Sequence, residues 1–199
     1  MLRLIPYDRM AAVEYAHRWA FGRNPAYYDF SALGGDCTNF ASQCLYAGTG
    51  VMNFTPDLGW YYLGEDDRAP AWTGVPFFWD FLVREERSAG PYGISVPLIL
   101  LRPGDFVQIR FETSGGVFAH TPVVVSVGFP PRPANILVAA HSNDADNRPL
   151  DSYENVAELR FLHILGAAAP DGDGQDGPPA GESTPEAGGD PDGEGGGQP

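Results

Sequence analysis

The first half of the chain repeats apolar side chains at helical spacing. In residues 7–21, alanine and aromatic positions recur every three or four residues, which is the pattern of an amphipathic helix. The same spacing returns further on, so we expect three helices, over residues 7–21, 37–47 and 73–86. Asp8 and Thr73 are suitable N-caps for the first and the third helix, and Gly48 follows the second as a stop signal.

The second half of the chain changes to short β-branched and alternating runs. These runs predict four strands, over residues 106–111, 120–127, 136–141 and 159–165. Pairs of glycines and prolines mark the loops between them. Because the helices come first and the strands follow, we expect an α+β fold, with N-terminal helices packed on an antiparallel sheet.

The composition changes once more near the C-terminus. From residue 166 onward the chain is rich in Gly, Pro, Ala and acidic residues, with no aromatic and no large aliphatic residue. Such a segment cannot bury enough apolar surface to offset its ordering entropy. We therefore expect one compact domain over residues 1–165 and a disordered acidic tail over residues 166–199.

The net charge of −14 disfavours nucleic acid as a partner. The tail holds eight of the 26 acidic residues, so the rest of the chain has 18 acidic and 12 basic side chains, without a basic cluster. Phosphate neutralisation needs clustered basic residues. No run approaches the roughly 20 apolar residues of a transmembrane segment, and residues 1–20 lack the pattern of a secretory signal. As the chain stands we expect a cytoplasmic protein, or an exported one if an upstream segment is missing.

One cysteine stands where a helix begins. Cys37 follows a Gly-Gly-Asp turn and opens the predicted helix over residues 37–47. A helix N-terminus offers unpaired N–H groups and a positive dipole end, and both favour a thiolate. Cys37 is therefore the candidate nucleophile, whereas Cys44 falls on the apolar stripe of the helix and is expected in the core. The helical rise separates the two residues by about 10.5 Å, which excludes a disulfide between them.

A cysteine nucleophile needs a base, and the predicted strands supply two candidates. His120 opens the strand over residues 120–127, and His141 closes the strand over residues 136–141. Antiparallel neighbours place opposite strand ends side by side, so we expect the two imidazoles to meet, with the helix tip docked beside them. Asp36, directly before the cysteine, suits either a helix cap or support for this site.

Several short motifs accompany these residues. They are Tyr15-Ala16, Trp19-Ala20, Asn24-Pro25, Gly35-Asp36-Cys37-Thr38-Asn39-Phe40, Trp60-Tyr61-Tyr62, Ala71-Trp72, Pro103-Gly104-Asp105, His120-Thr121 and His141-Ser142-Asn143-Asp144. With them, the chain resembles the bacterial putative amidase domain family, a branch of the papain-like and NlpC-like cysteine hydrolases, over residues 7 to 165. The Asp-Cys-Thr-Asn-Phe core with a later His-Thr pair is the specific part of this resemblance.

The resemblance implies a papain-like fold and a thiol-dependent hydrolase of amide or peptide bonds. It implies Cys37 as the nucleophile and His120 as the base. It places the third polar residue on the following strand, where His141 is the first choice and Asn143 and Asp144 are the alternatives. The substrate it suggests is a peptidoglycan stem peptide, if the protein is exported. An acyltransferase with the same Cys-His site and a non-catalytic peptide-binding module are the competing hypotheses.

Two further groups of residues have two interpretations each. The aromatic cluster Trp60, Tyr61 and Tyr62 suits either a substrate-binding wall or plain core. The oxygen-bearing side chains of residues 143–147 suggest calcium, but they lack the EF-hand spacing and its closing glutamate. A zinc site built on Cys37 and the two histidines is disfavoured because the helix-tip position suits thiolate catalysis. We therefore expect no metal ion and no cofactor.

Overall fold

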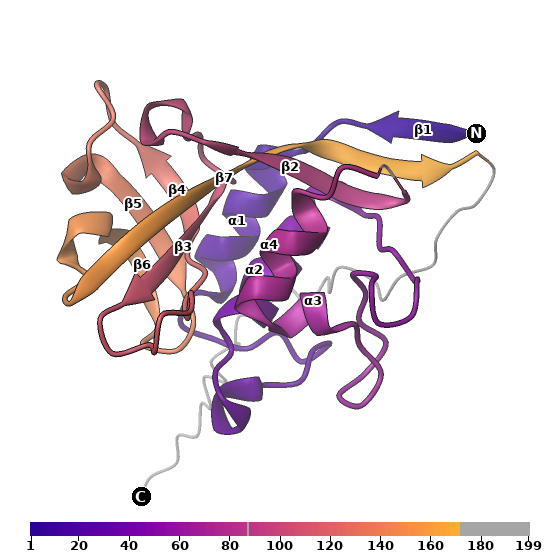
Figure 1. Ribbon diagram of the computed structural model, residues 1–199, viewed down its shortest axis with the longest axis horizontal. Helices are drawn as coiled ribbons and strands as arrows, with labels where there is room; N and C mark the ends of the chain where they lie inside the picture. Colours follow the sequence, from indigo (N-terminus) through magenta and orange to yellow (C-terminus); the bar gives the residue numbers. More distant parts are fainter. Residues whose placement is uncertain (87, 172–199) are drawn as a thin grey trace, which may run out of the picture.

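The computed structural model describes residues 1–86 and 88–171. Its central element is a seven-stranded β-sheet (Figure 1). Its strands are β1 (Leu2–Ile5), β2 (Gly90–Val96), β3 (Phe106–Phe111), β4 (Val123–Val127), β5 (Ile136–Ala140), β6 (Ala145–Pro149) and β7 (Val156–Pro170). Every strand pair is antiparallel, and the order is β1-β7-β3-β4-β5-β6, with β2 also on β7. The expected α+β class with an antiparallel sheet is confirmed.

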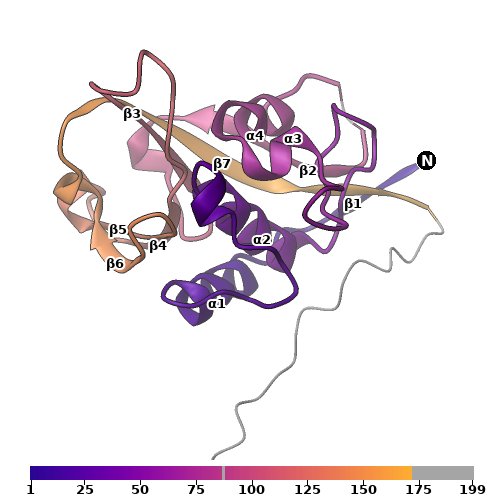
Figure 2. The same cartoon turned by 90° about the horizontal axis from the view of Figure 1, so that it is seen from below.

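Helices fill the space below the long ribbon that β7 and β2 form, while β3 to β6 lie at its left end in Figure 1. The α-helices are α1 (Arg9–Trp19), α2 (Cys37–Thr49), α3 (Pro70–Thr73) and α4 (Val75–Leu82). Short 3-10 helices span Phe30–Leu33, Leu98–Leu100, Pro133–Asn135 and Leu150–Ser152. Figure 2 shows α1 and α2 side by side, with α1 next to β4. The tip of α2 is thereby brought to the same end of the molecule as β4 and β5.

The first two helices form where the sequence pattern predicts them. Asp8 caps α1, because its side chain accepts a hydrogen bond from the backbone N–H of Ala11 at 3.0 Å. The expected end of α2 at Gly48 is wrong, since the helix continues to Thr49 and Gly50 takes the left-handed conformation after it, with φ 63°. Gly48 is instead a packing position, since a Cβ there would lie 2.3 Å from the Tyr7 ring.

The third predicted helix is two helices in the structure. Thr73 is the last residue of α3 rather than an N-cap, and Gly74 stands before α4. The extended backbone of Gly74, with ψ 122°, breaks the helical run. The helix then ends at Leu82, four residues before the expected position. Phe77 is 55 % exposed, and the inward face of α4 starts with Phe78, which is fully buried.

The strand predictions locate β3, β4, β5 and β7, and they miss the short edge strands β1, β2 and β6. Their expected ends at the histidines are wrong, since β4 begins at Val123, three residues after His120, and β5 ends at Ala140, one residue before His141. β7 runs to Pro170 and its last residues pair with β1, so the sheet extends past the expected boundary at residue 165. Alanines at 167–169 are buried there, although the composition of this stretch resembles that of the tail. The part of the expected acidic tail from residue 172 onward lies outside the described residues.

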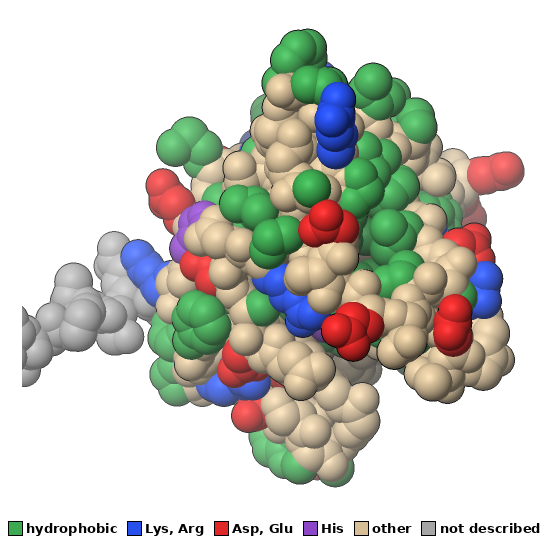
Figure 3. Space-filling view, turned by 90° about the vertical axis from the view of Figure 1, so that its left-hand side faces the viewer, with side chains coloured by type: hydrophobic (Ala, Val, Ile, Leu, Met, Phe, Trp, Pro, Cys, Tyr) green, Lys and Arg blue, Asp and Glu red, His purple; other side chains and the backbone are tan. Residues whose placement is uncertain are grey.

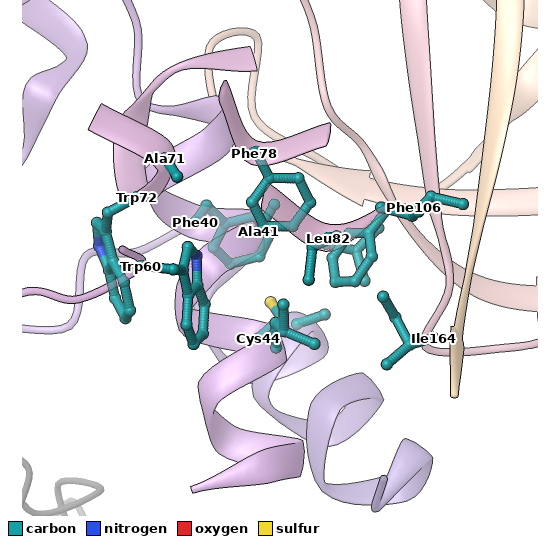
Figure 4. Close-up of a cluster of buried hydrophobic side chains, with 14 of the residues drawn as sticks. Phe40, Ala41, Cys44, Trp60, Ala71, Trp72, Phe78, Leu82, Phe106 and Ile164 are labelled. Carbon is teal, nitrogen blue, oxygen red and sulfur yellow. The ribbon is translucent and has the colours of Figure 1, made fainter. Parts of the chain in front are cut away.

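Two layers of core side chains lie on opposite faces of the sheet. The face toward the helices contributes Val123, Ala139 and Ile164, which pack with the aromatic side chains of α2, α3 and α4. Figure 4 shows part of this layer, with Cys44 enclosed between α2 and its apolar neighbours, as expected for a core cysteine. The other face contributes Ile109 and Val138, which pack with Phe111 of β3, Phe161 of β7 and Tyr153. None of the helices within the described residues is long and apolar enough to span a membrane.

Candidate active site

Cys37 is the first residue of α2, as the sequence predicts, and it lies at the junction of that helix with the sheet. Its side chain is 7 % exposed. The sulfur lies 3.8 Å from the hydroxyl oxygen of Thr38. Burial raises the pKa of the Cys37 thiol, and the negative charge of Asp36 adds to this rise, while hydrogen bonds from the backbone of Thr121 and from Thr38 oppose it. The thiol is therefore neutral near pH 7 in this state.

His120 lies directly before Thr121 in the chain, so the residue that contacts the sulfur is its neighbour. Its backbone forms an isolated antiparallel bridge with Ile109. Its ring nitrogen Nε2 lies 3.2 Å from the hydroxyl of Tyr153. Burial, and after it the positive charge of Arg148, lowers the pKa of His120 to about 4. The imidazole is consequently neutral at pH 7 and able to accept a proton.

The candidate nucleophile Cys37 and the candidate base His120 thus lie at the same end of the fold, and both are uncharged there. Within residues 1–86 and 88–171, no hydrogen bond joins the Cys37 sulfur to the His120 ring. Catalytic hydrogen bonds are often loose in the absence of substrate and tighten when it binds. Tyr153 lies close to both groups: its hydroxyl contacts His120, and its pKa is raised to about 12 by burial, with a smaller rise from Cys37, while the charge of Arg148 opposes the rise.

His141 does not contact His120, although β4 and β5 pair as expected. Its Nδ1 lies 2.6 Å from the Asp36 carboxylate, and its Nε2 lies 2.8 Å from the backbone oxygen of Trp19. Both partners are hydrogen-bond acceptors, so both ring nitrogens are placed to donate. The His141 ring also stacks on Phe40, with 4.0 Å between centroids.

The two histidines are separated because they project from opposite faces of the sheet. His141 follows Ala139 by two residues, so it shares the face that packs on the helices. His120 pairs with Ile109, whose side chain belongs to the other core layer. Both histidines lie at the same end of the sheet because they are near adjacent ends of neighbouring strands. The alternation of side chains along each strand then decides to which face of the sheet each histidine points.

The alternatives for the third residue have different surroundings. Asn143 lines the same pocket as His120 and is exposed, with a left-handed backbone at φ 79°. Asp144 forms an ion pair with Arg23 at 3.0 Å, on the side of α1. Tyr153, which no sequence motif singles out, is the residue that the structure places on the His120 ring. It follows the 3-10 helix Leu150–Ser152, far from His120 in the chain.

Asp36 precedes Cys37, the candidate nucleophile, but its side chain does not cap α2. The carboxylate is fully buried and accepts hydrogen bonds from the backbone N–H of Phe30 at 2.9 Å, the side chain of Asn39 at 2.8 Å and His141. Its backbone N–H donates to the hydroxyl of Ser142 at 2.8 Å. Asp36 therefore fastens the start of α2 to the end of β5 and fixes the position of the next residue, Cys37.

Replacing Asp36 by alanine is expected to lower the free energy of unfolding by about 3–5 kcal/mol, because it leaves three buried donors without their acceptor: the Phe30 N–H, the Asn39 side chain and the His141 ring. Urea unfolding at pH 7 measures the change. Asp29→Asn is the matched control, since Asp29 is an exposed aspartate that caps the neighbouring 3-10 helix, and its loss should cost at most about 1 kcal/mol. Equal, small losses in both variants would show that Asp36 does not hold the site together.

The aromatic cluster divides between core and surface. Trp60 is fully buried, donates its ring N–H to the Ser42 hydroxyl at 3.0 Å, and packs on Trp72. Tyr62 is 5 % exposed and packs on the same tryptophan. Burial leaves these two side chains no surface for a substrate, so their position agrees with plain core. Tyr61 is half-buried against Phe54, and substrate contact for it stays a prediction.

Comparison with known proteins identifies one family and one relative that match most of the chain. The family model described as "Putative amidase domain" matches residues 6–164. The chain is 36 % identical over 170 residues to the uncharacterized protein YhbB of Bacillus subtilis (strain 168), an alignment that covers 82 % of this chain and 52 % of that protein. The chain thus spans about half the length of this relative. No solved structure matches the chain.

Proposed function

Since the chain belongs to the putative amidase domain family, we propose that it hydrolyses an amide bond and that the thiol of Cys37 is the nucleophile. The family itself indicates amide hydrolysis in general terms. The observation that carries the finer proposal is a chain of contacts at the tip of α2. The backbone of Thr121 hydrogen-bonds the buried Cys37 sulfur, His120 is the residue before Thr121, and the Tyr153 hydroxyl contacts the His120 ring. Cysteine hydrolases need this combination of a nucleophile, a base and an orienting group.

The first half of the reaction forms a thioester. His120, neutral at pH 7, accepts the thiol proton as the sulfur attacks the carbonyl carbon of the substrate. The carbonyl oxygen becomes negatively charged and lies at the N-terminus of α2, where the backbone N–H of Cys37 and the positive end of the helix dipole stabilise it. The protonated His120 then donates its proton to the leaving nitrogen, and the carbon–nitrogen bond breaks.

The second half of the reaction releases the acid. His120, neutral again, removes a proton from a water molecule, which attacks the thioester carbon. The carbon–sulfur bond breaks, the proton returns to the sulfur, and the carboxylic acid product leaves. If an amine attacks in place of water, the same site acts as an acyltransferase.

A cysteine on a helix tip that packs against an antiparallel sheet, with a histidine in an isolated bridge just before β4, supports placing the chain among papain-like, NlpC-like hydrolases. We keep this placement as part of the proposal. A cell-wall stem peptide is the first natural substrate to test, because the resemblance of the motifs suggests it.

The function is tested with the full chain and a panel of peptides and simple amides, with products identified by mass spectrometry. We expect a free acid and a free amine, and hydroxylamine should divert part of the acyl group into a hydroxamate by intercepting the thioester. Exclusive transfer to added amines would establish the acyltransferase. Binding without any turnover would contradict the enzyme assignment and favour a peptide-binding module.

Tyr153 is a positioning residue in this account. Its hydroxyl lies 3.2 Å from Nε2 of His120, so Tyr153→Phe removes the only polar group that the described part of the chain places on that nitrogen. Loss of one such hydrogen bond is expected to lower kcat by about tenfold, with KM nearly unchanged. Tyr46→Phe is the control, because Tyr46 packs on Trp72 at the far end of α2. A rise in KM with unchanged kcat would instead assign Tyr153 to substrate binding.

A further inference from the structure

A pocket of about 340 Å³ opens directly beside the candidate base. The His120 and Tyr153 rings form part of its wall, together with Ser142, Asn143 and Arg148. Ser142 connects this wall to the nucleophile, because its hydroxyl accepts the backbone N–H of Asp36, the residue before Cys37. The volume is at the lower end of the range for small-molecule sites. A substrate that reaches the sulfur therefore has a place next to His120 for one of its groups.

Arg148 is held in this wall by three contacts. Its Nε donates to the Ser152 hydroxyl at 2.8 Å, and its Nη2 donates to the Ser152 backbone oxygen at 3.0 Å. The guanidinium carbon lies 3.8 Å from the centroid of the Tyr153 ring. These contacts fix the plane of the guanidinium while leaving further N–H groups for a ligand, since arginine carries five.

The charge of Arg148 has no carboxylate partner in the part of the chain that the structure describes. Among residues 1–86 and 88–171, no carboxylate oxygen lies within 4.0 Å of its guanidinium nitrogens. Glu154 also lines the pocket, but it is an exposed residue and forms no ion pair with Arg148. Figure 3 views the molecule from the side where β4, β5 and β6 lie, and there arginine and acidic side chains are interspersed rather than grouped by sign. Attraction of an anion to this pocket therefore depends on Arg148 itself.

We propose that this pocket binds a carboxylate of the amide substrate through Arg148. A fixed guanidinium matches a carboxylate with two parallel hydrogen bonds. The substrates favoured by this site would be amides that carry a free carboxylate close to the bond that is cleaved, such as a short peptide with its C-terminal carboxylate. The position of the cleaved bond relative to this carboxylate rests on the proposed function. Binding of the carboxylate to Arg148 does not require turnover and can be measured separately.

The specificity test compares hydrolysis of acetyl-alanyl-alanine and its C-terminal amide. The wild type is expected to prefer the carboxylate form, and Arg148→Gln to lower kcat/KM for that form by about 10- to 100-fold while changing the amide form less than about threefold. Arg148→Lys should retain part of the preference. Arg110→Gln is the control, because Arg110 is already paired with Glu158 at 2.8 Å. Equal losses on both substrates, or no preference in the wild type, would overturn the subsite.

A binding measurement keeps this test independent of catalysis. Calorimetry with Cys37→Ala and the same two peptides should show tighter binding of the carboxylate form, and the difference should vanish in the double variant with Arg148→Gln. If the two peptides bind equally to the double variant, and its thermal unfolding midpoint is normal, the result supports the subsite. If the double variant still binds the carboxylate form more tightly, the result overturns it. Arg148-dependent binding together with an inactive wild type would overturn the proposed hydrolysis and leave the anion site intact.

Discussion

Cys37→Ala is expected to abolish amide hydrolysis, lowering kcat on the order of 10⁴-fold or more. The sulfur supplies the attacking electron pair in this mechanism, and alanine leaves no nucleophile at the tip of α2. The substitution removes one buried atom beside the Thr121 backbone, so the fold should remain intact. The measurement is kcat on the most active substrate of the panel, alongside the thermal unfolding midpoint of both proteins.

Cys44→Ala is the matched control for this variant. Cys44 is fully buried in the core layer on the helix-facing side of the sheet, and burial raises the pKa of its thiol well above the ordinary value. Removing its sulfur should cost about 1–2 kcal/mol of stability through the cavity left behind, with kcat of the folded protein unchanged. Activity that survives Cys37→Ala, or disappears only with Cys44→Ala, would remove Cys37 from the role of nucleophile.

His120→Gln is expected to lower kcat by about 10²- to 10⁴-fold, the range of a lost general base. Glutamine preserves a polar side chain near the Tyr153 hydroxyl, so the loss reports the proton transfer rather than collapse of the pocket. Asn143→Ala is the control, because Asn143 is an exposed residue that lines the same pocket. It measures how far kcat falls after a substitution in the pocket that leaves the imidazole in place. Equal losses in the two variants would contradict a special role for the imidazole.

The pH profile of the wild type follows from the same residue. Burial, followed by the charge of Arg148, lowers the pKa of His120 from its ordinary 6.5 to about 4. The base acts when neutral, so kcat/KM is fully present above this pKa and is lost as the pH falls through about 4. Because burial raises the pKa of the Cys37 thiol, Cys37 and His120 together still hold one proton at alkaline pH, so kcat/KM should not fall there. A broad plateau from about pH 5 to pH 9 is expected; an acid limb at pH 6.5 would show an exposed, unperturbed imidazole.

Local patterns predicted the parts of the fold that depend on neighbouring residues. The spacing of alanines and aromatics identified α1 and its Asp8 cap, and the alternating run at 106–111 coincides with β3. The strands β1 and β2 were missed because they form only against the distant β7. β6 pairs with its neighbour β5, but its sequence Ala-Asp-Asn-Arg-Pro lacks the β-branched, alternating pattern of a strand. The end of α2 was misplaced for a similar reason, since Gly48 is required by its contact with Tyr7 and not by a turn.

The candidate site shows the same limit. The Gly-Gly-Asp-Cys segment is a local signal, and it placed Cys37 correctly at the first position of α2. The expectation that His120 and His141 meet used the order of strand ends but not the alternation of side chains, which sends them to opposite faces. Tyr153 reaches His120 through the tertiary fold alone, and a lone tyrosine after a short 3-10 helix gives no signal in the sequence.

The central claim is that Cys37 and His120 act as one proton-sharing pair, and iodoacetamide labelling measures this most directly. Mass spectrometry would follow the labelling rate of Cys37 from pH 4 to pH 10 in the wild type and in His120→Gln, with Cys44 as the internal reference. We expect a plateau of labelling from about pH 5 to pH 8 that depends on His120, and a second rise above pH 9 in both proteins. Identical profiles in the two proteins, with labelling only at the alkaline rise, would contradict the pair.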